Sequence, residues 1–250
     1  QAVTGIVERR HTLPILSNVL LENVHGQTNI LATDLEIQIN TAGPESDAGD
    51  FRITTNAKKL QDILRALPDG SLVALDWAQN RLTLKAGKSR FNLQTLPAED
   101  FPLMSVGETV GQAFSLPQEA LKNMLSQVQY SMAVQDIRYY LNGMLMQTEG
   151  DQLRLVATDG HRLAYSGTTI DADLPKAEVI LPRKTVLELF KLLNHPSEPV
   201  TVELLENQVR FRCNETVIVS KVVDGKFPDF NRVIPLDNDK IFLVGRTQLL

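Results

Sequence analysis

Short runs of apolar residues, many of them alternating with polar ones, fill the first hundred residues of the chain. Such runs predict strands that bury one or both faces. They occur at residues 19–21, 30–32, 35–39, 72–76, 82–84 and 90–96. The period changes once, where Leu60, Ile63, Leu64 and Leu67 fall at the i, i+3, i+4 and i+7 positions of one helical face, and the turn residues 68–70 close this helix. This part of the chain is therefore predicted to be a set of strands around one helix.

The second half of the chain repeats this combination of strands and helices. Pro117 and Pro182 each follow an apolar run and open a helix, because proline is well placed at a helix start. The apolar stripes of these helices are Leu121, Met124, Leu125 and Val128, and Val186, Leu189, Phe190 and Leu193. Strands are expected at residues 113–116, 153–157, 179–181, 200–204, 209–213 and 217–223. Separate helices among hairpin-linked strands predict the α+β fold class.

The two halves share landmarks at a nearly constant spacing. Thr33-Asp34 ends one apolar run, and Thr158-Asp159 ends another 125 positions later. Phe101-Pro102 and Phe227-Pro228 close the two halves and lie 126 positions apart. Agreement in order, element type and spacing indicates a duplicated unit.

A Gly-containing polar linker places the boundary between the units near residue 108. The predicted units are residues 1–108 and 109–237. Residues 238–250 are expected to begin a third unit, because they resemble the strand and helix start at 114–121. The first unit shows no counterpart of that strand and helix start, so we expect a fragment of a parent with at least three units.

Composition narrows the class of protein. A chain of 250 residues with 43% hydrophobic residues has enough apolar side chains for two cores. No run reaches the roughly 18 apolar residues of a membrane helix, and the single Cys213 cannot form an internal disulfide. These features predict a cytoplasmic location. The net charge of −5 excludes a uniformly basic surface, so any contact with nucleic acid depends on local patches.

The segment Asp159-Gly160-His161-Arg162 is the strongest candidate for chemistry, because it combines a carboxylate, an imidazole and a guanidinium. Asp-Gly is equally typical of a plain turn, and we favour that interpretation. A hydrolase that uses Asp159 with His161 is the enzymatic alternative. The sequence contains no Gly-x-Ser-x-Gly, His-Glu-x-x-His or P-loop motif to support it. We therefore expect no enzyme, no metal and no cofactor.

Five segments carry a resemblance to a known family. They are residues 12–16, 95–102, 136–143, 157–163 and 224–229. Together they resemble the bacterial sliding clamp, the beta subunit of DNA polymerase III, over essentially the whole chain. The resemblance implies an α+β fold of tandem clamp domains, each with helices on one side and antiparallel sheets on the other. It also implies a homodimeric ring around duplex DNA that acts as a processivity factor.

Partners and sites follow from the resemblance. The implied partners are duplex DNA, bound without sequence preference, and the polymerase, the clamp loader and repair proteins, which bind through short peptides. The peptide pocket would consist of Leu141, Thr158, Gly160, His161, Arg162, Leu163, Pro228, Arg232 and Val233. The edge strand with Arg90, Phe91 and Leu93 would form a subunit interface.

Basic residues on the polar faces of the expected helices fit a surface that attracts phosphates. These residues are Lys58, Lys59, Arg65, Lys122, Arg183, Lys184 and Lys191. The resemblance adds Arg10, Gln135, Arg138, Tyr139 and Tyr140 to the side that faces DNA. For each single lysine, an ordinary solvated helix face is the alternative. For the whole chain, the alternative is a duplicated α+β protein-binding module without a role on DNA.

Overall fold

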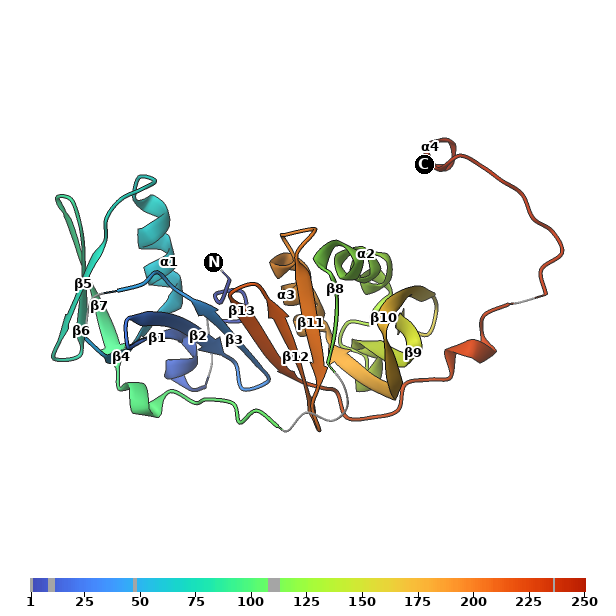
Figure 1. Ribbon diagram of the computed structural model, residues 1–250, viewed down its shortest axis with the longest axis horizontal. Helices are drawn as coiled ribbons and strands as arrows, with labels where there is room; N and C mark the ends of the chain where they lie inside the picture. The colour runs from blue at the N-terminus through green and yellow to red at the C-terminus, as the bar shows by residue number, and fades with distance from the viewer. Residues whose placement is uncertain (1, 9–11, 47–48, 108–112, 236) are drawn as a thin grey trace.

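The computed structural model describes residues 2–8, 12–46, 49–107, 113–235 and 237–250. It is an elongated body with a C-terminal arm that extends away from it (Figure 1). Strands and helices alternate as the sequence patterns predict, which confirms the α+β class with antiparallel sheets. No helix of the described residues is long and apolar enough to cross a membrane.

The first unit is a run of antiparallel strands around one helix. Its strands are β1 (Asn18–Val24), β2 (Gln27–Thr33), β3 (Ile37–Ala42), β4 (Phe51–Asn56), β5 (Ala74–Ala78), β6 (Arg81–Ala86) and β7 (Ser89–Leu96). The turn between β1 and β2 is formed by His25 and Gly26, both at positive φ, as a tight hairpin requires. Leu35, expected in a strand, has a φ of 76° and belongs to the turn before β3.

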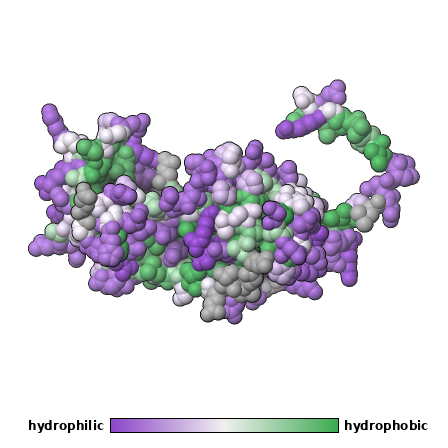
Figure 2. All heavy atoms as spheres, in the orientation of Figure 1, coloured by the Kyte–Doolittle hydropathy of each residue, from purple (hydrophilic) through white to green (hydrophobic). Residues whose placement is uncertain are grey.

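Helix α1 (Ala57–Ala66) begins at Asn56, whose side chain accepts a hydrogen bond from the backbone of Lys59. The helix packs on β1 and β4. Its predicted apolar stripe is only partly covered, since Leu64 keeps 44% of its surface exposed. Figure 2 shows apolar surface at this end of the molecule.

The second unit contains two helices that pack together over a long hairpin. The helices are α2 (Gln118–Val128) and α3 (Arg183–Leu192), and the hairpin strands are β9 (Gly143–Thr158) and β10 (Leu163–Pro182). The remaining strands are β8 (Phe114–Pro117), β11 (Pro199–Leu204), β12 (Gln208–Cys213) and β13 (Thr216–Lys221). Short 3-10 turns occur at Pro14–Ser17, Ala98–Asp100, Gln129–Ser131, Tyr139–Leu141 and Phe230–Arg232.

The two units share one sheet. Strand β3 of the first unit pairs antiparallel with β13 of the second, with Ile39 opposite Ile218. This pair completes an 11-stranded sheet, while β9 and β10 form a separate two-stranded sheet. Both isoleucines are fully buried and belong to one apolar core that extends through both units. Burial also raises the pKa of the Cys213 thiol to about 12, as expected for a small core residue.

The C-terminal arm corrects one prediction. Residues 242–244 were expected to form a strand, but none forms there in the described part of the chain. Phe242 and Leu243 are 83% and 98% exposed, and no strand among the described residues pairs with them. Figure 2 shows apolar surface along part of the arm, away from the body. The helix start does form, as α4 (Arg246–Leu249).

Candidate peptide pocket and nucleic-acid face

The Thr-Asp motif of the second unit forms a turn that its own side chains hold in place. Thr158 Oγ1 donates to the carbonyl of Arg162 at 2.7 Å and accepts the N–H of Gly160 at 3.1 Å. Asp159 Oδ1 accepts the N–H groups of His161 and Arg162, both at 3.0 Å. Gly160 has a φ of 87°, where a glycine is most readily accommodated.

The Thr-Asp motif of the first unit makes the same bonds. Thr33 Oγ1 donates to Ile37 O at 2.9 Å and accepts the N–H of Leu35 at 3.0 Å. Asp34 Oδ1 accepts the N–H groups of Glu36 and Ile37 at 2.9 and 2.8 Å. The sequence repeat therefore corresponds to a repeated hydrogen-bonded turn, in which Leu35 occupies the place of Gly160.

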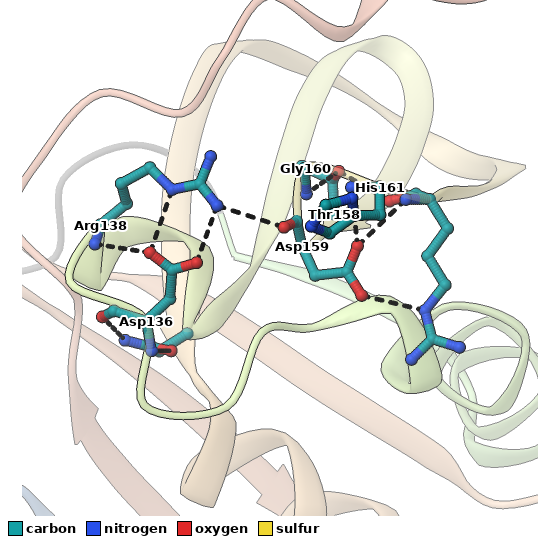
Figure 3. Close-up of polar contacts among 8 residues, drawn as sticks. Asp136, Arg138, Thr158, Asp159, Gly160 and His161 are labelled. Atoms are coloured by element: carbon teal, nitrogen blue, oxygen red, sulfur yellow. Dashed lines mark hydrogen bonds and ion pairs between the residues drawn. The ribbon is translucent and has the colours of Figure 1, made fainter.

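A second loop approaches the turn at Gly160 (Figure 3). Arg138 donates two hydrogen bonds to the Asp136 carboxylate, from Nε at 3.0 Å and from Nη2 at 2.7 Å. Its Nη2 also donates to the carbonyl of Asp159 at 3.2 Å. The loop is braced by Asn142, whose side chain bonds both the N–H and the C=O of Asp136. The hydrogen bonds from Arg138 lower the pKa of Asp136 to about 2.

Loop and turn enclose a hollow of about 430 Å³. Its lining residues are Arg138, Tyr140, Leu141, Thr158, Gly160, His161, Arg162, Leu163, Pro228, Asp229, Phe230 and Val233. The buried Leu141 and Phe230 and the half-buried Leu163 pack in one small apolar cluster. The hollow thus has an apolar floor and a polar, partly basic rim.

Eight of the nine residues predicted for the pocket line this hollow. Arg232 does not, because its side chain is 84% exposed and pairs with Asp229. Arg138 and Tyr140 were predicted on the side that faces DNA, yet they line the hollow. Asp229 and Phe230 were missed, although they continue the Phe-Pro motif that marks the end of the unit.

The hydrolase alternative finds no support in this geometry. One oxygen of Asp159 accepts two backbone N–H groups, and the other accepts Arg162 Nε at 3.1 Å. These hydrogen bonds lower the pKa of Asp159, so the carboxylate is held in its charged form as part of the turn. The His161 backbone bonds to this carboxylate, whereas no contact of its imidazole ring with it is found among the described residues.

Several basic residues predicted to face DNA are bound to partners within the chain. Lys58 pairs with Asp62 and Lys191 with Glu188. Lys122 was predicted to point outward, but its ammonium donates to the carbonyl of Leu193 at 2.7 Å and lies over the Phe190 ring.

Lys184 was also predicted on an outward helix face. It instead pairs with Asp34 and Glu8 of the first unit.

The other candidates differ in their surroundings. Lys59 and Arg65 are exposed on α1 and have no ion pair within the described ranges. Arg183 bonds weakly to the carbonyl of Met132 at 3.5 Å. Gln135 and Tyr139 are exposed on the loop that carries Arg138. Arg10 lies outside the described residues.

Strand β7 carries the residues predicted for a subunit interface. It pairs with β6 from Ser89 to Gln94, but its pairs with β4 are confined to Thr95 and Leu96. One edge of its first half is therefore without a strand partner in the part of the chain that the structure describes. Arg90 is exposed, whereas Leu93 is 6% exposed and belongs to the core, so its side chain is unavailable to a partner.

Tandem α+β units that share a sheet, with a hollow beside a repeated Thr-Asp turn, define a duplicated clamp-type protein. The family models agree. The N-terminal domain of the DNA polymerase III beta subunit matches residues 1–105, and the central domain matches residues 115–229. The chain belongs to the DNA polymerase III beta subunit family.

Individual relatives are similar over nearly the whole chain. The beta sliding clamp of Pseudomonas aeruginosa is 44% identical and covers 100% of this chain and 68% of the relative. That of Salmonella typhimurium is 43% identical, with 98% and 67% covered. The chain thus spans about two thirds of these relatives. Membership of this family agrees with the prediction that the chain is not an enzyme, because the relatives are named as clamps.

Solved structures show the same fold. The crystal structure of the Pseudomonas aeruginosa subunit superposes with a TM-score of 0.91 at 43% identity, covering 96% of this chain and 65% of that one. The sliding clamp of Caulobacter crescentus gives a TM-score of 0.88 at 39% identity, covering 96% and 66%. Another structure of the Pseudomonas aeruginosa clamp is bound to griselimycin.

Proposed function

We propose that this chain is part of a sliding clamp that encircles duplex DNA and tethers the replicative polymerase, the clamp loader and repair proteins through short peptides. The observation that carries the proposal is the hollow beside the Thr158-Asp159 turn, in a chain of the beta subunit family. The proposed domains are those predicted from the sequence, with a boundary near residue 108 and the start of a third unit at 238–250.

The hollow has the character of a peptide site. Leu141, Leu163 and Phe230 supply apolar walls, and Val233 remains 66% exposed at the edge. His161 and Arg162 lie on the rim, where they are accessible to the backbone or to polar groups of a ligand. Short peptides bind such sites by burying an apolar anchor while rim groups fix the orientation.

The DNA side of the proposal depends on exposed cations of α1 and on the loop with Gln135 and Tyr139. Lys59 and Arg65 are the best candidates, because no carboxylate neutralises them in the described ranges. Contacts of this kind attract phosphates without reading bases, and they weaken as salt rises. Lys58 and Lys191 remain weaker candidates, since each already has an acidic partner.

Ring formation is supported by the repeat itself. The five residues 216–220 of β13 pair with β3 across the unit boundary. Residues 90–94 of β7 lie 126 positions earlier, at the equivalent place in the first unit. We propose that their unpaired edge accepts a strand of another subunit by the same antiparallel pairing. Arg90 and Phe91 would then contribute side chains, and Leu93 its backbone alone.

A test of the pocket compares two substitutions by titration calorimetry with a clamp-binding peptide of the polymerase. His161→Ala removes a rim group and is expected to weaken binding about 5- to 30-fold, the range of a lost polar contact. Arg232→Ala is the matched control, because this exposed residue lies outside the lining. Equal affinities for wild type and His161→Ala, or a larger loss in Arg232→Ala, would refute the pocket assignment.

A further inference from the structure

A cluster of three charged groups lies beside the strand pair that joins the units. Lys184, the second residue of α3, places Nζ 2.5 Å from Asp34 Oδ2 and 2.9 Å from Glu8 Oε1. Asp34 and Glu8 belong to the first unit and Lys184 to the second. The cluster therefore links the units through side chains, in addition to the backbone pairing of β3 with β13.

The Asp34 carboxylate is largely withdrawn from water and lies against the Lys184 ammonium. Its side chain is 9% exposed, and Oδ1 is already bonded to the two N–H groups of the Thr-Asp turn. A carboxylate so withdrawn from water is costly unless it is paired. Burial alone would lower the pKa of Lys184, but the hydrogen bonds and charges of Asp34 and Glu8 outweigh burial and raise it.

The same turn is also held from the strand side. Lys221, the last residue of β13, donates its backbone N–H to the carbonyl of Glu36 at 2.9 Å. Its ammonium reaches the Glu36 carboxylate at 3.0 Å. The second unit thus contacts the turn of the first unit from two elements, α3 and β13.

The lysine at the second position of the helix pairs with the other unit in α3 but with its own helix in α1. Lys58 is the second residue of α1 and occupies the place equivalent to Lys184, 126 positions earlier. It pairs with Asp62 of its own helix at 2.8 Å. In the second turn, Asp159 Oδ2 is likewise satisfied locally, by Arg162. Only the combination of Lys184 with Asp34 crosses a unit boundary at these repeated positions in the described chain.

We propose that Asp34, Lys184 and Glu8 form a lock that fixes the angle between the two units, and that Lys184 serves this lock and not DNA. A single antiparallel strand pair tolerates a wide range of twist, from about −10 to −35° between neighbours. A charged contact to one side of the pair restricts that rotation. The lock does not depend on the proposed function, because it operates within the free chain.

Inter-unit distances measured by pulsed electron spin resonance test the lock. Spin labels are attached through Lys88→Cys in the first unit and Ser197→Cys in the second, both at exposed turns. Cys213 is buried and its thiol pKa is raised to about 12, so it does not take up label. Asp34→Asn and Lys184→Gln keep the approximate size of each side chain and remove its charge. Asp34→Asn also keeps the oxygen that accepts the turn N–H groups.

Each single variant is expected to broaden the distance distribution. The double variant should broaden it no further than Lys184→Gln alone, because that substitution already removes the ion pair with Asp34. Lys58→Gln, at the repeat-equivalent position, should leave the distribution unchanged. An unchanged distribution in Lys184→Gln, or broadening by the double variant equal to the sum of the singles, would overturn the lock.

The salt dependence of duplex DNA binding tests the second half of the proposal. Lys59→Gln is expected to reduce the slope of log affinity against log salt by about 1, as for a lost phosphate contact. Lys184→Gln should keep the wild-type slope. A reduction by about 1 in Lys184→Gln would assign this lysine to DNA and contradict the proposal. If Lys59→Gln also kept the slope, the proposed DNA face would fail, while the distance measurements would still decide the lock.

Discussion

At the scale of single residues, the two copies of the Thr-Asp turn place a leucine and a glycine at the same positive-φ position. Leu35 adopts a φ of 76° and Gly160 a φ of 87°. A side chain in this region costs roughly 1–2 kcal/mol, which the first copy tolerates. In the second copy, a Cβ at position 160 would lie 3.0 Å from Arg138 Nη1. The glycine therefore allows the Arg138 guanidinium to approach the turn.

Gly160→Ala is expected to lower the free energy of unfolding by about 1–2 kcal/mol, through backbone strain and displacement of Arg138. Urea denaturation measures the loss. Gly87→Ala is the matched control, since Gly87 also has a positive φ but nothing within 4 Å of its would-be Cβ. A loss in Gly160→Ala no larger than in Gly87→Ala would show that the contact with Arg138 is unimportant.

The ionised Asp136 carboxylate makes the stability of the fold depend on pH in the acid range. Arg138 lowers its pKa to about 2, from an ordinary value of 3.8. Because the folded-state pKa is depressed, the stabilisation is complete above the ordinary value and is lost as the pH falls from about 4 to about 2. The stability of wild type should therefore fall more steeply over this window than that of Asp136→Asn, as followed by urea denaturation at each pH. Parallel pH profiles would contradict the assignment.

At the scale of elements, strand β7 belongs both to the core and to the proposed subunit interface. Its Leu93 side chain is 6% exposed in the core, while the backbone of the same strand offers an unpaired edge. Leu93→Ala is expected to cost about 2–5 kcal/mol of unfolding free energy, the range for a truncated core leucine. Leu96→Ala, at 40% exposure on the same strand, should cost less than about 1 kcal/mol. Denaturant titration of both variants decides whether residue 93 is a core position.

Elements were predictable from sequence where one local pattern determines them. The period of Leu121, Met124, Leu125 and Val128 predicts α2, and all four are buried there. The stripe of α1 has the same period, yet Leu64 is exposed, because periodicity shows which face is apolar and not what covers it. Phe242 to Val244 fail as a strand for a related reason, since a strand needs a partner.

Sites were predictable where they lie within one motif and less so where distant segments meet. The family resemblance of one motif assigned Thr158 and Gly160 to Leu163 to the pocket, and all five of these residues line the hollow. Arg138 was assigned to the DNA side, because nothing in its own segment indicates that it bonds to Asp159, 21 positions away. The ion pair of Lys184 could not be predicted for the same reason, since its partner Asp34 lies 150 positions earlier.

At the scale of the whole molecule, the shared sheet predicts that the two units unfold together. Ile39 and Ile218 are both 0% exposed at the joint, and one apolar core continues through it. Separating the units would expose this surface to water, at about 25 cal/mol for each Å². The free energy that couples the unfolding of the two units should therefore be larger than for units joined by a flexible linker alone.

The single tryptophan makes this coupling measurable. Trp77 lies in the first unit, 4.8 Å from the Phe51 ring, so its fluorescence reports on that unit alone, whereas far-ultraviolet circular dichroism reports on both. The two probes are expected to give coincident urea transitions in wild type. Ile218→Ala, which leaves a cavity at the joint, should shift both midpoints and separate them. Coincidence that persists in Ile218→Ala, with only a common shift, would mean that the charged lock and the remaining strand contacts suffice to couple the units.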